Sequence, residues 1–291
     1  MHSIRKSGDA ALAPHPIYAN HSQGYTQASL VDHATGSVHT GLCLGQLAVD
    51  GTLAPHVHSY EEGFYILEGQ AEVTSNGQAY LLGPGDFGAF KVGTPHSWRN
   101  AGAAPVRWLQ MAAPQPKPVG KERDTFFLKG GFPKDAPPPS AAKPLTGSDA
   151  GANLLGHFDV GQIPPPEQRT AGVVGSPGVF LKWLIDEQFG ARHHRMLFLE
   201  YQPGASIPLH DHTFEEAYFL LSGEVQATLD GERYLAKPGD VLWTGVGCVH
   251  SFANNGSEPV RWLETFSPQP PAENVFRFMA EWEKKAKEIE G

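Results

Sequence analysis

Residues 204–223 read GASIPLHDHTFEEAYFLLSG, and a second version of this stretch, DGTLAPHVHSYEEGFYILEG, occupies residues 50–69. Around these two stretches, residues 30–116 align with residues 184–270 at a constant offset of 154 and without a gap. In this alignment 31 of the 87 positions are identical. A repeat of this length indicates two copies of one domain, and it governs every inference about the fold.

The positions kept in both copies carry metal-binding chemistry. They are His56, His58, Glu62 and His96 in the first copy and His210, His212, Glu216 and His250 in the second. Residues two apart on a strand point to the same face, so each His-x-His pair presents both imidazoles together. Neutral imidazoles and one carboxylate suit a divalent transition metal, namely Mn, Fe, Co, Ni, Cu or Zn. We expect one ion per copy, with one or two coordination positions open to a substrate.

Short β runs separated by Gly, Pro and Asn make up the first copy. The runs that we expect to be strands are 42–49, 63–67, 71–74, 78–82, 87–92 and 106–111. Asn76-Gly77 and Asp230-Gly231 stand at equivalent positions and favour type I′ hairpin turns. Many short strands with regular turns indicate an all-β sandwich or barrel. Ligands from separate strands can converge inside such a barrel.

The composition along the chain suggests five segments. We expect an N-terminal arm at 1–29, a first barrel at 30–130, a Pro- and Ala-rich linker at 131–150, a second barrel at 151–270 and a C-terminal helix at 271–291. The helix is predicted from apolar residues on one side and charges on the other. These apolar residues are Val275, Phe276, Phe278, Met279 and Trp282. Either the barrel or a second subunit is expected to cover them, so a homo-oligomer stays open.

Bulk properties exclude several classes of protein. The formal net charge is −9 and the isoelectric point is about 5.8, which argues against a nucleic-acid binder. There is no run of 18 apolar residues and no apolar N-terminal signal, so we expect a cytoplasmic protein without membrane contacts. Cys43 and Cys248 lie in different copies and do not suggest a disulfide framework.

The motifs resemble those of the cupin superfamily, and their double occurrence resembles a bicupin. The first cupin motif, G-x5-H-x-H-x(3,4)-E-x6-G, is matched by Gly204, His210, His212, Glu216 and Gly223. The first copy matches it at His56, His58, Glu62 and Gly69, but Asp50 stands where the leading glycine belongs. We expect this change to alter a turn rather than the metal site.

The second cupin motif, G-x5-P-x-G-x2-H-x3-N, is also present twice. It is matched at Gly85, Gly93, His96 and Asn100 and again at Gly239, Gly247, His250 and Asn254. The motif proline is replaced by Lys91 and by Gly245. The resemblance implies two cupin barrels in tandem, each a double-stranded β-helix of the jelly-roll type with its own metal centre.

Four aromatic residues are expected to form the pocket walls. Phe64 and Tyr218 lie two residues after the ligand glutamates, and Trp98 and Phe252 lie two after the last ligand histidines, so strand alternation points them inward. Such a pocket suits an aromatic or otherwise hydrophobic small molecule. Oxalate would need an arginine near the metal, and no arginine has a clear claim to either pocket.

The resemblance implies a metal-dependent enzyme, and its leading form is a quercetinase-like dioxygenase. In that case Glu216 or Glu62 doubles as the base for a substrate hydroxyl. The second copy matches the motif better and is the expected active site. Two alternatives stay open: a redox-neutral isomerase, cyclase, lyase or aminohydrolase similar to ureidoglycine aminohydrolase, and a bicupin that binds metal or ligand without turnover.

Overall fold

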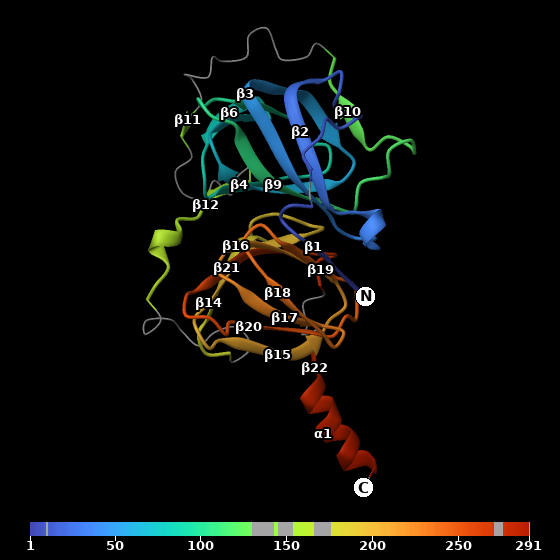
Figure 1. Cartoon of the computed structure of the whole chain (residues 1–291). Helices are drawn as coiled ribbons and strands as arrows, with labels where there is room; N and C mark the ends of the chain where they lie inside the picture. The colour runs from blue at the N-terminus through green and yellow to red at the C-terminus, as the bar shows by residue number, and fades with distance from the viewer. Residues whose placement is uncertain (10, 130–142, 145–153, 166–175, 271–275, 291) are drawn as a thin grey trace.

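The computed structural model describes residues 1–9, 11–129, 143–144, 154–165, 176–270 and 276–290. Figure 1 shows two β-barrels stacked on one another, with the C-terminal helix projecting away from the second. The pairing within both barrels is antiparallel except between one short strand and its neighbour, so the all-β fold class is confirmed.

The first barrel is organised around one long strand. Its elements are β2 (Ser22–Val31), the 3-10 helix η1 (His33–Thr35), β3 (Gly41–His58), β4 (Glu61–Glu68), β5 (Ala71–Ser75), β6 (Gln78–Leu82), β7 (Asp86–Phe90), β8 (His96–Asn100), β9 (Val106–Ala113) and β10 (Thr125–Phe127). Strand β3 pairs with β2 and β9 through its first part and with β8 and β10 near its end. The sequence runs predict β3–β7 and β9, whereas β2, β8 and β10 are additional.

The second barrel consists of two sheets. One has the order β1-β19-β16-β21-β14-β13 and the other the order β18-β17-β20-β15-β22. The strands are β1 (His2–Arg5), β13 (Val179–Ile185), β14 (Arg195–Tyr201), β15 (Ser206–Asp211), β16 (Glu215–Ser222), β17 (Val225–Leu229), β18 (Glu232–Ala236), β19 (Val241–Thr244), β20 (His250–Ala253), β21 (Val260–Ser267) and β22 (Arg277–Phe278).

The two barrels exchange edge strands. Strand β1, at the start of the chain, pairs with β19 of the second barrel. Strand β12 (Leu155–His157) pairs with β7 of the first barrel, and the short β11 (Lys143–Pro144) pairs with β6. A 3-10 helix, η3 (Val160–Gln162), follows β12. Each added strand caps the hydrogen-bonding edge of a sheet that would otherwise be open.

Strands β1, β2 and β11 lie wholly or mostly in segments that the sequence predicts to be an arm and a linker. Residues 1–29, expected to be an irregular arm, contain β1 and most of β2. The linker expected at 131–150 lies outside the described residues except for 143–144. We propose barrels at 30–130 and 151–270, as the sequence suggests. Two strands do not follow this division: β1, from outside both ranges, joins the second barrel, and β12, from the second range, joins the first.

A hydrophobic core joins the barrels, in addition to one core inside each. The shared core includes Leu42 and Met111 from the first barrel and Met196, Phe198 and Leu263 from the second. Because this core is common to both halves, burial of apolar surface between the barrels stabilises their association.

Two buried carboxylates reinforce the contact between the barrels. Glu61 accepts hydrogen bonds from the backbone of Arg192 and His193 and lies 2.7 Å from His194 Nδ1. Glu215, at the equivalent position, accepts from the backbone at 38–40 and from the Ser37 hydroxyl. Strand alternation predicts that both glutamates face away from the metal centres, and the structure gives them this hydrogen-bonding role.

The turns follow the sequence. Asn76 and Gly77 have φ angles of 48° and 78°, and Asp230 and Gly231 have 47° and 86°, as a type I′ turn requires. Asp50 has φ 60° and Gly204 has φ 81°. Aspartate tolerates the left-handed region better than most residues, so the turn survives the loss of the motif glycine.

The C-terminal helix α1 (Met279–Glu290) is shorter than the sequence suggests. Residues 277–278 form β22 instead, and residues 271–275 lie outside the described part of the chain. Trp282 is 55% exposed, so the barrel leaves the apolar side of α1 uncovered. Among the described helices, none has the length and apolar character that crossing a membrane would require.

Candidate metal centres

The first candidate centre lies inside the first barrel. His56 and His58 lie at the end of β3, and His96 begins β8 directly opposite His56. The three imidazoles are buried and offer nitrogens that lie within 4.8 Å of one another. Glu62 Oε2, from β4, is 3.0 Å from His58 Nε2 and 3.9 Å from His96 Nε2. The four residues of the motif therefore converge.

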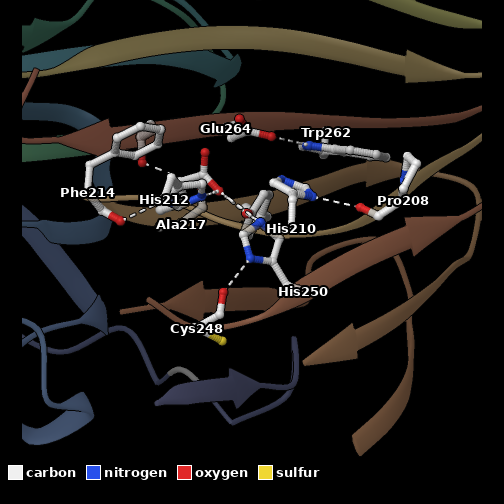
Figure 2. A network of polar contacts seen from close by, with 12 residues as sticks. Pro208, His210, His212, Phe214, Ala217, Cys248, His250, Trp262 and Glu264 are labelled. Atoms are coloured by element: carbon white, nitrogen blue, oxygen red, sulfur yellow. Dashed lines mark hydrogen bonds and ion pairs between the residues drawn. The ribbon is translucent and has the colours of Figure 1, made fainter. Parts of the chain in front are cut away.

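The second candidate centre has the same construction, which Figure 2 shows at close range. His210 on β15 pairs with His250 on β20, and His212 follows β15 immediately. Their nitrogens again lie within 4.8 Å of one another. Glu216 Oε2, from β16, is 2.7 Å from His212 Nε2 and 3.4 Å from His250 Nε2. The Tyr218 hydroxyl also donates to Glu216.

Hydrogen bonds orient the imidazoles. Five of the six use Nδ1 on a backbone oxygen at 2.7–2.9 Å; the pairs are His56 with Ala54, His96 with Thr94, His210 with Pro208, His212 with Phe214 and His250 with Cys248. A carbonyl oxygen only accepts, so these Nδ1 atoms carry a proton, and in a neutral imidazole this leaves the Nε2 lone pair for the centre. His58 Nδ1 pairs with the Thr125 hydroxyl at 3.0 Å. Such outer contacts typically fix the tautomer of a metal-binding histidine.

Burial keeps most of the imidazoles neutral. It lowers the pKa of His56 and of His58 to about 3 and that of His210 to about 4, and it holds the pKa of His96 well below its ordinary value. These four side chains are therefore uncharged at neutral pH. Metal binding requires this form, because a protonated nitrogen has no lone pair to donate.

The two glutamates differ in their electrostatics. Burial raises the pKa of Glu62 to about 7, although His56 and a hydrogen bond from Gln110 oppose it. Burial also acts to raise the pKa of Glu216, but His212 and His250 outweigh it and hold this pKa well below its usual value. The pKa of His212 is raised in turn: burial lowers it, and the adjacent Glu216 more than compensates.

The donor set fits a bound metal ion. His58 Nε2 and His96 Nε2 are buried and make no hydrogen bond with any described residue, although His58 Nε2 lies 3.0 Å from Glu62 Oε2. Buried polar atoms normally have partners, and unpartnered nitrogens aimed at a shared point suit an ion there. Three imidazoles and a carboxylate favour a divalent transition metal without selecting one.

At one position next to the candidate ligand glutamates, the two barrels carry different residues. In the first barrel, Gln110 donates from Nε2 to Glu62 Oε2 at 2.8 Å. The equivalent residue in the second barrel is Glu264, which accepts from Trp262 Nε1 at 3.2 Å. Burial, with the nearby Glu216 carboxylate, raises the pKa of Glu264 well above its ordinary value. The two barrels thus place an amide and a carboxyl group at the same position, a difference that comparison of the two copies could have flagged.

The two candidate centres also differ in whether their residues line a cavity. A cavity of about 160 Å³ in the second barrel is lined by His210, Glu216 and His250 themselves. A larger cavity of about 380 Å³ in the first barrel reaches Tyr60, Thr125 and Gln110, but none of the four motif residues is among its lining. Tyr60 stacks on His58 with ring centres 4.4 Å apart. The first centre is therefore one layer of side chains away from its cavity.

The four aromatic residues expected as pocket walls divide between the barrels. Tyr218 and Phe252 line the second cavity. Phe64 and Trp98 instead pack together in the first core, with ring centres 5.0 Å apart. The reason is Phe90, which stacks on His96 at 4.0 Å and fills the interior, whereas its counterpart in the second repeat is the smaller Thr244.

Short closing strands cover both centres, and sequence reasoning missed them. Strand β10 places Thr125 opposite His58 and Phe127 opposite His56. Strand β22 places Phe278 opposite His210. Both strands lie outside the aligned repeat, so no shared motif pointed to them.

One expectation needs correction: an arginine does reach a pocket. Arg195, the first residue of β14, lines the second cavity. Its guanidinium carbon lies 5.3 Å from the Trp183 ring centre and 5.7 Å from that of Phe266. The sequence does not reveal this, because the equivalent residue in the first copy is Gly41 and the motifs do not include β14.

Comparison with known proteins agrees with this architecture. The cupin domain family matches residues 44–111 and 197–266. The structure of Lactobacillus farciminis oxalate decarboxylase in its formate complex has a TM-score of 0.63 over 97% of this chain and 90% of that chain, at 19% identity. The chain carries two cupin domains in tandem and has the fold of a bicupin.

Curated relatives are more distant in sequence. Quercetin 2,3-dioxygenase of Bacillus subtilis is 25% identical over 222 residues, which are 68% of this chain and 64% of that protein. Gentisate 1,2-dioxygenase of a Ralstonia species is 36% identical over 63 residues, 21% of this chain and 18% of that protein. The chain spans less than two thirds of the length of these relatives.

Proposed function

We propose that the protein is a metal-dependent oxidoreductase of the dioxygenase type, with its active site in the second barrel. The observation that carries this proposal is the cavity into which His210, Glu216 and His250 open directly. A metal ion needs an open side to act on a substrate, and the first centre is covered by Tyr60 and Phe90. The two relatives whose names describe dioxygenases support the same class.

The cavity limits the size of the substrate. A volume of about 160 Å³ is close to that of an engineered cavity of about 150 Å³ that holds benzene. Aromatic rings from Phe214, Tyr218, Phe252 and Phe266 line it. We therefore propose a substrate with one aromatic ring, or a hydrophobic molecule of similar size, rather than a flavonol with several rings.

The chain's own residues would bind the substrate and move its proton. When bound, the metal would supply Lewis-acid and redox chemistry to a substrate oxygen and to O2. Glu216 is ionised and hydrogen bonded to the Tyr218 hydroxyl, so it is placed to accept a proton from a substrate hydroxyl. Glu264, whose pKa is raised by burial and by the adjacent Glu216 carboxylate, can return a proton. The apolar walls exclude water. Glu62 would have the same role in the first barrel only if that centre opened.

A redox-neutral reaction is the second candidate. The buried carboxyl groups of Glu216 and Glu264 line the same cavity and have pKa values shifted in opposite directions, so they can serve as base and acid, which an isomerase, cyclase or lyase needs without any oxidant. A bicupin that binds a ligand without turnover is the third.

Oxygen consumption separates these functions. The metal-loaded protein is incubated with single-ring phenols, catechols and small diketones while O2 uptake and substrate loss are recorded. We expect uptake that disappears in His210→Ala and persists in the matched His56→Ala. Substrate loss without O2 uptake would favour the redox-neutral reaction. No substrate loss with metal bound at the second centre would contradict both.

The exposed side of α1 supports a further proposal, that the protein is a homo-oligomer. Trp282 and Ile289 are exposed on this helix. We expect sedimentation to give a mass above that of one chain, and Trp282→Ser to lower it. A single-chain mass for the unaltered protein would contradict the proposal.

A further inference from the structure

We infer that Arg195 forms an anion-binding subsite in the second cavity and that the substrate is a small aromatic molecule bearing a carboxylate. The inference rests on the proposed function only in that it assigns the substrate to this cavity. Arg195 is absent from both cupin motifs, and the first copy has Gly41 in its place.

The sheet register aims Arg195 into the cavity. Arg195 on β14 pairs with Phe266 on β21, and Phe266 pairs in turn with Glu216 on β16. Directly opposed residues on neighbouring strands point to the same face, so all three side chains enter the barrel together. Strands are about 4.8 Å apart, which separates the Arg195 and Glu216 backbones by roughly 10 Å. The guanidinium and the metal centre thus belong to opposite sides of one cavity.

The surroundings of the guanidinium hold it in place. It lies against the rings of Trp183 and Phe266, which lie edge to face with centres 5.9 Å apart. A guanidinium stacks well on aromatic faces because it is planar and weakly hydrated. Trp183, Phe266 and Arg195 all line the cavity, so an aromatic ligand would meet both ring surfaces and a positive charge.

Arg195 has an unused donor. Its Nη2 lies 2.8 Å from Glu187 Oε2, but its Nε is buried and makes no hydrogen bond with any described residue. A buried donor without a partner is unfavourable, so a ligand oxygen that accepts a hydrogen bond from this nitrogen would be stabilised there. Glu187 is half exposed, and an ion pair at such a position is weak because solvent screens it. It is a weak competitor for a carboxylate ligand.

The geometry matches one class of molecule. A ring of benzene size fills a cavity of this volume. A carboxylate on one end would bind Arg195, and an oxygen or π system on the other would face the centre. A carboxylate is preferred over a neutral polar group because a charge-assisted hydrogen bond is about twice as strong.

Calorimetric titration of the metal-loaded protein with benzoate and with benzamide tests the inference. These probes share size and shape and differ in charge. We expect benzoate to bind at least ten times more tightly than benzamide, and Arg195→Met to abolish the preference. Lys182→Met, on the exposed side of the adjacent strand β13, removes a charge without touching the cavity and should keep the preference. Glu187→Gln should keep or strengthen it.

Two results would overturn the inference. One is equal binding of the two probes, or no binding, by the unaltered protein. The other is a benzoate preference that survives in both Arg195→Met and Arg195→Gln, since benzoate would then be held elsewhere, for example at the metal. Because binding is measured without turnover, a protein that holds benzoate through Arg195 but consumes no O2 contradicts only the proposed oxidation.

Discussion

Asp50 and Gly204 occupy the same place in the two copies of the first motif, and both adopt positive φ angles. The motif therefore demands a backbone conformation, which two different residues can supply. The candidate metal ligands behave differently, since the same side chain stands at each of their four positions in both copies. Spacing and strand alternation predict their convergence because both are local properties of the chain. The walls of the pocket depend on distant residues, such as Phe90 and Thr244, and could not be predicted from the motif alone.

Glu216→Gln tests the ligand set at this scale. Glutamine keeps the shape of the side chain but removes a negative oxygen, so metal occupancy of the second centre should fall. Elemental analysis against protein concentration measures this, and Glu62→Gln is the matched variant for the first centre. Occupancy that stays at the level of the unaltered protein would show that Glu216 is not a ligand.

Strands β1 and β12 are elements that the repeat does not predict. The alignment covers 30–116 and 184–270, and both exchanged strands lie outside it. In the first copy of the repeat, β3–β7 and β9 were predictable because their alternation and turn residues are local, whereas β8 was not predicted. The exchanged and closing strands pair with partners far away in the sequence, and a pattern within four or five residues does not identify such partners.

Ile4→Ala tests the contribution of β1. Ile4 is partly buried against the core of the second barrel. Its truncation should lower the free energy of unfolding by about 1–2 kcal/mol, less than the 2–5 kcal/mol of a fully buried Ile or Leu. Urea unfolding measures the change. Val246→Ala, at an exposed position of the same barrel, should have little effect. An equal change in the two variants would mean that β1 does not stabilise the barrel.

Across the whole molecule, the two barrels are alike in construction but differ in the cavities beside their candidate centres. Both have three histidines and one glutamate, and in the described part of the chain the cavity that such residues line is in the second barrel, together with Arg195 and Glu264. The barrels share a core and exchange strands, so we treat them as one folding unit. Glu61 and Glu215 each accept hydrogen bonds from the opposite barrel. Each directly precedes a candidate metal ligand, Glu62 or Glu216.

Glu61→Gln should change how the stability of the protein depends on pH. Burial acts to raise the pKa of Glu61, but His194 and the backbone N–H groups of His193 and Arg192 outweigh it, so its pKa is lowered. The resulting stability is present above the unfolded pKa of about 4.3 and is lost as pH falls through the lower folded pKa.

We expect the unaltered protein to exceed Glu61→Gln in stability by about 2–3 kcal/mol at pH 7, and the gap to shrink below about pH 4.3. Urea unfolding at several pH values measures it. Glu68→Gln, at an exposed position on the same strand, is the control. A gap that does not change with pH would argue against an ionised Glu61 at the interface.

We propose that each barrel holds a metal ion among its three histidines and one glutamate. Anomalous diffraction from crystals of the metal-loaded protein, recorded on both sides of the absorption edge of the bound metal, locates such ions. We expect two peaks, one among His56, His58, Glu62 and His96 and one among His210, His212, Glu216 and His250. Peaks elsewhere, or no peak at either cluster in metal-loaded crystals, would rule out metal binding by these residues.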